Sequence, residues 1–101
     1  MVLSPDDLQR ASVDSHAVVE ELKAAGAYVT ASGINPEIPA VLVSAGGAVE
    51  PAHYADTDGF NGGITIIDVA TRDEAVVWAG KIAAACRCPQ ELREFYYDPA
   101  V

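Results

Sequence analysis

A chain of 101 residues has room for one domain, residues 1–101, and at this size burial leaves only a thin margin of stability. Half of the residues are apolar and 21% are charged, which excludes a disordered chain. The net charge of −9, with six basic residues scattered singly, argues against nucleic-acid binding. No apolar stretch approaches the roughly 20 residues that span a bilayer and no signal-peptide pattern is present, so we expect a cytoplasmic protein without membrane contact.

The first predicted element is a helix from about residue 5 to residue 25. Ser4 is suited to cap it, Pro5 fits its first position and Gly26 is a typical C-terminal stop. At 100° per residue, one stripe of this helix is mainly apolar and should face a sheet. The stripe consists of Leu8, Ala11, Ser15, Val18, Val19, Leu22 and Ala25. His16 lies on its polar flank.

Five strand signals are separated by turn residues or by the second predicted helix. Residues 27–32 and 40–44 are two predicted strands, and a short return strand begins at Val49 after the turn at 45–47. Residues 64–69 are the most confident strand, because β-branched side chains on both faces are typical of a central position in a covered sheet. Arg-Glu-Phe-Tyr-Tyr at 93–97 is a predicted last strand, closed by Pro99.

The second predicted helix begins at a capping box formed by Thr71 and Glu74 and runs to about Ala85. Its apolar face consists of Ala75, Val76, Trp78, Ala79, Ile82 and Ala83, with Trp78 expected in the core. The order of elements predicts an α+β fold of the ferredoxin-like split βαβ type, with an antiparallel sheet, two helices and an inserted hairpin in the first half. Only Met1-Val2-Leu3 remain for its first strand.

Titratable side chains gather in the loop that precedes the strand at 64–69. His53 with Asp56 or Asp58 could form an imidazole–carboxylate couple, and Tyr54 could donate to a developing oxyanion. The same residue types also form ordinary turns, which is the alternative interpretation. The glycines from 59 to 63 do not have dinucleotide-loop spacing and are interpreted as turn and bulge residues.

Cys86 and Cys88 are too close together for an easy internal disulfide, and no second pair completes a zinc site. We interpret them as cysteines at a helix end, with a metal or redox role as the alternative. No metal or cofactor is expected. Tyr28, Tyr96 and Tyr97 lie on predicted strands, where one of them could line a pocket or a dimer interface.

Several segments carry a family resemblance. They are Thr57-Asp58-Gly59, Gly62-Gly63 with the following Ile-Thr-Ile-Ile-Asp-Val, the run Arg-Asp-Glu-Ala-Val-Val-Trp-Ala, Ser-Pro-Asp-Asp-Leu at the start and Glu-Glu-Leu-Lys-Ala-Ala-Gly at 20–26. On these the chain resembles the YCII-related superfamily, within it the DGPF-domain branch. The resemblance implies a homodimeric α/β barrel assembly with small-molecule pockets between sheet and helices. It also implies either lyase, isomerase or dehydrochlorinase-type chemistry without a cofactor, or a regulatory role beside a sigma factor.

Three departures from the family pattern bear on the site. The first strand is nearly absent, the Asp-Gly-Pro-Phe stretch is shortened to Asp58-Gly59-Phe60-Asn61, and the helix-one position that often carries a family histidine is Ser15. The catalytic candidates are therefore His53, Asp56 and Asp58, with His16 as a substitute base. The substrate-binding candidates are Ser15, Tyr28, Tyr54 and Phe60.

Two further hypotheses are alternatives to an enzymatic function. A non-catalytic binding or regulatory module could contact a protein partner through its dimer surface, its acidic face or a sheet edge left open by the missing strand. The chain could also retain only the fold of its family.

Overall fold

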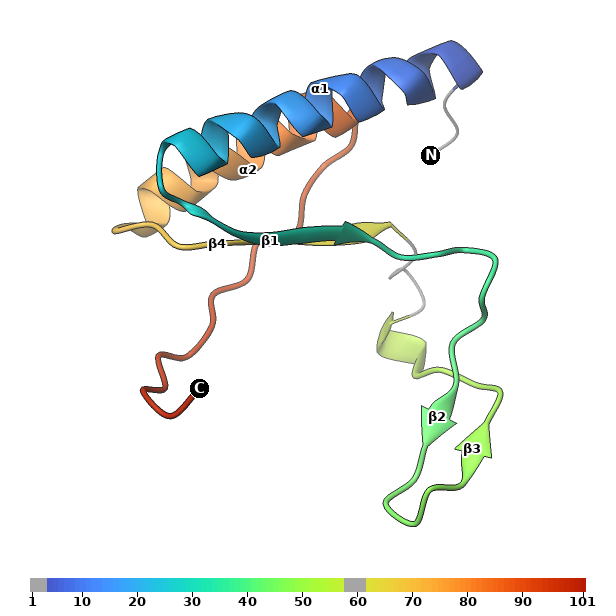
Figure 1. The fold of residues 1–101 in the computed structure, drawn as a ribbon. Helices are drawn as coiled ribbons and strands as arrows, with labels where there is room; N and C mark the ends of the chain where they lie inside the picture. Colours follow the sequence, from blue (N-terminus) through green and yellow to red (C-terminus); the bar gives the residue numbers. More distant parts are fainter. Residues whose placement is uncertain (1–3, 58–61) are drawn as a thin grey trace. The chain divides into compact units, whose positions relative to one another are not determined.

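A computed structural model describes residues 4–57 and 62–101 of the chain (Figure 1). Met1–Leu3, Asp58 and Phe60, which the sequence analysis singles out, lie outside these residues. The chain forms two compact units: unit 1 comprises Met1–Tyr28 and Ile67–Val101, and unit 2 comprises Val29–Ile66. Each unit is described separately below.

Helix α1 of unit 1 spans Pro5–Ala24, close to its predicted limits. The Ser4 hydroxyl accepts a hydrogen bond from the Asp7 backbone N–H at 3.2 Å and so caps the first turn. Gly26, with φ of 72°, ends the helix, and the Ala27 N–H donates to the Leu22 carbonyl at 2.9 Å. A left-handed residue just after the last turn is the usual place for glycine, so the predicted cap and stop are both confirmed.

Helix α2 spans Arg72–Cys86. The Thr71 hydroxyl accepts from the Glu74 N–H at 3.1 Å, which confirms the N-cap half of the predicted capping box. The helix ends at Arg87, a non-glycine residue with φ of 60°, and the Cys88 N–H donates to the Ala83 carbonyl at 3.1 Å. An L-residue in the left-handed region carries a conformational cost, so contacts of the Arg87 side chain must offset it.

The core of unit 1 lies where α1 packs beside α2 (Figure 1). Leu22 is fully buried at its centre, with Val18, Ala27 and Ala85 around it. Partly buried side chains surround this core, namely Tyr28, Ile67, Val69, Trp78 and Ile82. Complete burial of one leucine is worth roughly 1.5–3 kcal/mol, so this small cluster supplies much of the helix-pairing free energy.

The predicted apolar faces of the helices are buried only in part. Ala11, Val18 and Leu22 of the α1 stripe are buried, but Leu8 and Ala25 at its two ends are exposed. On α2, Val76 is exposed whereas Trp78 is partly buried against the core. Burial runs from Ala11 to Leu22 on α1 and is greatest at Ala85, near the C-terminal end of α2.

Strands β1 (Tyr28–Gly33) and β4 (Gly63–Ile67) form a two-stranded sheet. The Ile34 N–H donates to the Gly62 carbonyl at 2.7 Å beyond one end of the pair, and the Asp68 N–H donates to the Ala27 carbonyl at 2.8 Å beyond the other. Low numbers on one strand therefore face high numbers on the other, so the pair is antiparallel.

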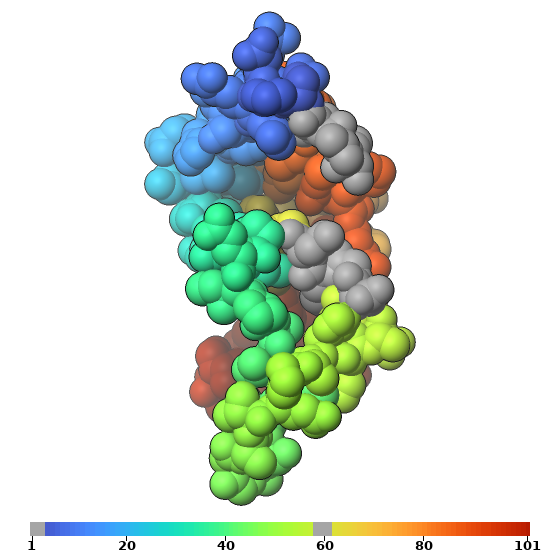
Figure 2. Space-filling model, turned by 90° about the vertical axis from the view of Figure 1, so that its right-hand side faces the viewer, coloured from blue at the N-terminus to red at the C-terminus, as the bar shows by residue number. Residues whose placement is uncertain are grey.

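Strands β2 (Leu42–Val43) and β3 (Val49–Glu50) form the inserted hairpin of unit 2. They pair antiparallel with Leu42 opposite Glu50 and Val43 opposite Val49. The Gly47 N–H donates to the Ser44 carbonyl at 2.8 Å, and Gly47 has φ of 90°, which favours glycine. The hairpin is confirmed, but its first strand is shorter than the predicted 40–44. Its residues lie in the green to yellow-green part of Figure 2.

The predicted strand at 93–97 is wrong. Residues 89–98 contain neither helix nor strand, and β1 and β4 are the only strands of their sheet among the described residues. Arg-Glu-Phe-Tyr-Tyr has high β propensity, but such propensity depends on packing against a neighbouring strand, and no strand of the described residues pairs with it. The α+β class with small antiparallel sheets and two helices is confirmed. None of the described helices is long and apolar enough to cross a membrane.

Candidate functional site

The helix-one position of the family resemblance lies at the contact between α1 and α2. Ser15 is half-buried, and its hydroxyl oxygen is 3.3 Å from the sulfur of Cys86, the last residue of α2. Either atom can be the donor, so the two side chains satisfy one another. A side chain held in this way joins the helices, which leaves it little freedom to bind a substrate.

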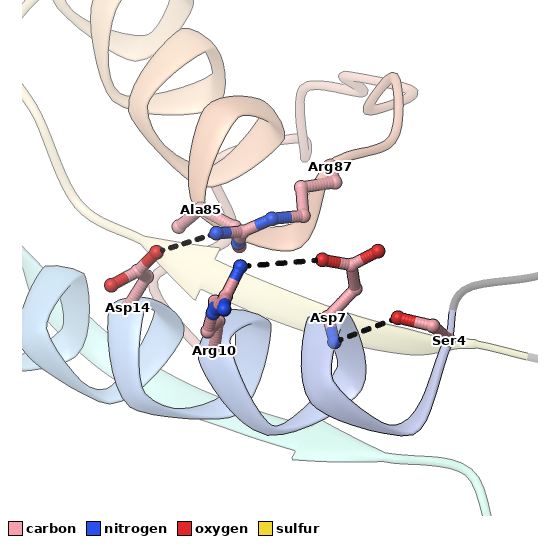
Figure 3. A network of polar contacts seen from close by, with 6 residues as sticks. All are labelled: Ser4, Asp7, Arg10, Asp14, Ala85 and Arg87. Carbon is pink, nitrogen blue, oxygen red and sulfur yellow. Dashed lines mark hydrogen bonds and ion pairs between the residues drawn. The ribbon is translucent and has the colours of Figure 1, made fainter.

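Arg87 fixes the end of α2 beside this contact (Figure 3). Its Nη2 lies 3.0 Å from Asp14 Oδ2 on α1, and its Nη1 donates to the Ala85 carbonyl at 2.7 Å. Arg10 pairs with Asp7 one turn earlier at 3.8 Å. The guanidinium thus caps a C-terminal carbonyl of α2 and meets a carboxylate of α1 at once, which is favoured near a helix C-terminus.

His16 lies outside this contact, as the sequence predicts. Its imidazole is exposed, and its Nδ1 is 2.6 Å from the carbonyl oxygen of Ser12 one turn earlier. A carbonyl only accepts, so Nδ1 is the donor and Nε2 of the neutral ring remains as the basic nitrogen. His16 could therefore accept a proton only from a molecule at the helix surface.

The loop candidates lie together in unit 2. His53, Tyr54 and Asp56 are all exposed, and the last of these belongs to a 3₁₀ turn, η1 (Ala55–Thr57). Both the N–H and the hydroxyl of Thr57 donate to the Tyr54 carbonyl at 3.0 Å, which holds this turn closed. Tyr54 and Asp56 belong to this turn, and His53 directly precedes it. Asp58 and Phe60 lie outside the described residues.

Tyr28 belongs to unit 1, where it packs against the core cluster. The Lys23 ammonium is 5.2 Å from the centre of its ring, a cation–π distance. Ser15 and Tyr28 therefore both have structural contacts within unit 1, and His53 and Tyr54 lie in unit 2. The role of each as a substrate-binding residue stays a prediction.

Both cysteines are free, half-buried thiols. Cys88 Sγ lies 3.5 Å from the Gln90 side-chain nitrogen, so it has a different neighbour from Cys86. In residues 4–57 and 62–101 no three His, Cys, Asp or Glu side chains are grouped as metal ligands would be.

Sequence analysis missed the Ser15–Cys86 and Asp14–Arg87 contacts. A signal for them was present, since a hydroxyl inside an apolar helical stripe requires a buried polar partner. Which residue contacts Ser15 depends on where α2 ends. The helix ends at Arg87, which has a left-handed backbone conformation, and rules that look for glycine at a helix end do not predict this position.

Comparison with known proteins returned one family. A family model for the YCII-related domain matches residues 3–87. This range includes the two α-helices and four strands of the described residues and ends at Arg87, before the aromatic residues at 95–97. No curated protein and no solved structure matches the chain.

Proposed function

Because this chain belongs to the YCII-related domain family, we propose that it is a cytoplasmic, homodimeric binding module that contacts a protein partner and does not transfer protons at helix one. The observation that carries this proposal is the 3.3 Å contact between Ser15 Oγ and Cys86 Sγ. Family members often carry a histidine at that helix position, and a base there requires a side chain directed toward substrate. Here the position joins two helices.

Exposed apolar side chains support a binding role. Val29 and Ile64 lie on β1 and β4, Ile34 follows β1, and all three are exposed. The hairpin adds Val43 and Val49, which are opposite one another and also exposed. Exposed apolar side chains on strands favour a protein interface.

The charge of the chain favours a partner with basic groups. The chain has fifteen acidic and six basic residues. All six basic side chains form ion pairs between described residues, namely Arg10, Lys23, Arg72, Lys81, Arg87 and Arg93. Complementary charge raises the association rate and excludes acidic partners. A sigma factor, which the DGPF resemblance implies, would be a partner of the required type if its contacting surface is basic.

A second candidate function is cofactor-independent acid–base catalysis at the loop of unit 2. The exposed His53, Tyr54 and Asp56, close together in sequence, favour it, since an imidazole, a phenol and a carboxylate are the groups that such chemistry uses. The substrate would be a small organic acid, with Asp58 and Phe60 as further contacts and His16 as a substitute base.

One experiment separates the two functions. Amide NMR spectra of the ¹⁵N-labelled chain would be recorded during titration with a panel of small aromatic and lactone acids, alongside the mass in solution. We expect a dimer whose amide shifts do not change saturably with any acid. Saturable shifts at 52–57, together with turnover that His53→Ala abolishes and His16→Ala retains, would instead establish the enzyme. Wild-type protein at the monomer mass of 10.5 kDa would contradict the homodimer.

A further inference from the structure

The segment that follows α2 exposes three consecutive aromatic side chains. Phe95, Tyr96 and Tyr97 are 73%, 100% and 89% exposed. They lie in the stretch 89–98, which contains neither helix nor strand and is drawn without an arrow in orange to red in Figure 1. A run of three solvated rings is unusual on a soluble protein and marks a surface that another chain covers.

Strand β4, in contrast, has an edge with no strand beside it among the described residues. Its consecutive β-branched residues, Ile64, Thr65, Ile66 and Ile67, have the composition of a strand with neighbours on both sides. In residues 4–57 and 62–101 it pairs with β1 alone, so its other edge has no strand beside it. A two-stranded sheet is marginal in water, and an open apolar edge accepts an added strand.

We propose that the two copies of the dimer exchange these segments, so that residues 93–97 of each copy pair as a strand with the outer edge of β4 in the other. This inference rests on the homodimer of the proposed function and specifies its interface. The lengths agree, because β4 and the segment have five residues each. Pro89 and Pro99 lack a backbone donor and limit the added strand to the residues between them.

The charges of the segment are already paired on its own chain. Arg93 Nε is 3.1 Å from Glu91 Oε2, and Glu94 Oε1 is 3.6 Å from Arg72 Nη1 at the start of α2. Burial of the three rings that follow would therefore leave no unpaired charge at residues 91–94. The first of the three rings, Phe95, directly follows Glu94.

The area is sufficient for a stable dimer. Phe and Tyr side chains bury about 150–250 Å² each, so six rings from two copies would bury about 900–1,500 Å². Stable interfaces bury about 1,200–2,000 Å² in total, and the backbone of the two added strands would contribute the rest. We favour a second copy of this chain as the partner at the β4 edge. In a twofold-symmetric dimer, the same exchange pairs the β4 edge and covers the aromatic segment in both chains.

The first test is the dissociation constant of the full chain by sedimentation equilibrium. Tyr96→Asp should weaken the dimer at least thirtyfold, since a central aromatic residue of an interface contributes about 2 kcal/mol or more. Its matched control is Val77→Asp, a second exposed apolar position, 61% exposed on α2, which should leave the dissociation constant unchanged. Tyr96 is fully exposed in the single chain, so its substitution should leave the helical signal in the circular dichroism spectrum unchanged.

The second test is independent of strand register. Isotope-filtered NOE spectra of a mixed sample, one half with labelled isoleucine methyls and the other half unlabelled, should show contacts between methyls of Ile64, Ile66 or Ile67 and aromatic protons of the other copy. A dimer that Tyr96→Asp leaves intact, or contacts confined to one copy, would overturn the exchange while the homodimer stands. A wild-type monomer would overturn the homodimer itself.

Discussion

Arg87 holds a left-handed backbone conformation at the end of α2 while its guanidinium pairs with Asp14 on α1 at 3.0 Å (Figure 3). Arg87 thus combines an unfavourable backbone conformation with favourable side-chain contacts. A glycine at this position would remove the conformational cost but also the contacts with Asp14 and the Ala85 carbonyl. At a position where helix-end rules favour glycine, this arginine connects the two helices.

The substitution Asp14→Ala should lower the free energy of unfolding by less than about 1 kcal/mol, because the pair is partly exposed and screened. Arg87→Gly should have a small net effect, since relief of the left-handed cost, about 1 kcal/mol, offsets the lost contacts. A double-mutant cycle measured by urea unfolding isolates the pair. A coupling free energy near zero would show that Arg87 acts only through the Ala85 carbonyl.

The substitution Ser15→His should not create an active site. An imidazole is larger than a hydroxyl and would meet Cys86 at the helix contact, so we expect a loss of about 1–3 kcal/mol in unfolding free energy from overpacking. Ser15→Ala, its matched control, should cost only about 0.5–1.5 kcal/mol through the lost hydrogen bond. A stable Ser15→His variant that gains turnover of a small organic acid would contradict the proposed binding role.

Local signals in the sequence predicted the local structure well. Ser4, Gly26 and Thr71 act through bonds to residues within five positions, so helix limits followed from capping rules alone. The strand at 93–97 and the environment of Ser15 were not predictable in this way. A strand requires a partner strand, and the half-buried Ser15 hydroxyl contacts Cys86, 71 residues away, which no local pattern indicates.

The substitution Gly63→Ala tests the pairing of β1 with β4. A Cβ at this position would lie 2.7 Å from the Ser32 carbonyl oxygen and 3.1 Å from the Gly33 Cα, so backbone must move. We expect a loss of about 1–3 kcal/mol in unfolding free energy, as for other overpacked sites. Gly62→Ala is the control, because its Cβ would meet nothing within 4 Å and should change stability by less than about 0.5 kcal/mol. Equal effects in thermal unfolding would show that the two strands do not approach as closely as described.

The substitution Leu22→Ala tests whether the helix pair forms the stable part of unit 1. Leu22 is the one fully buried side chain of the described core, and its loss leaves a cavity among Val18, Ala27 and Ala85. We expect a decrease of about 2–5 kcal/mol in unfolding free energy, which is a large part of the stability of a chain this small. Leu8→Ala removes the same atoms from a side chain that is 56% exposed on the same helix and should cost much less. If dimer formation supplies most of the stability, both variants would instead show unfolding midpoints that rise with protein concentration.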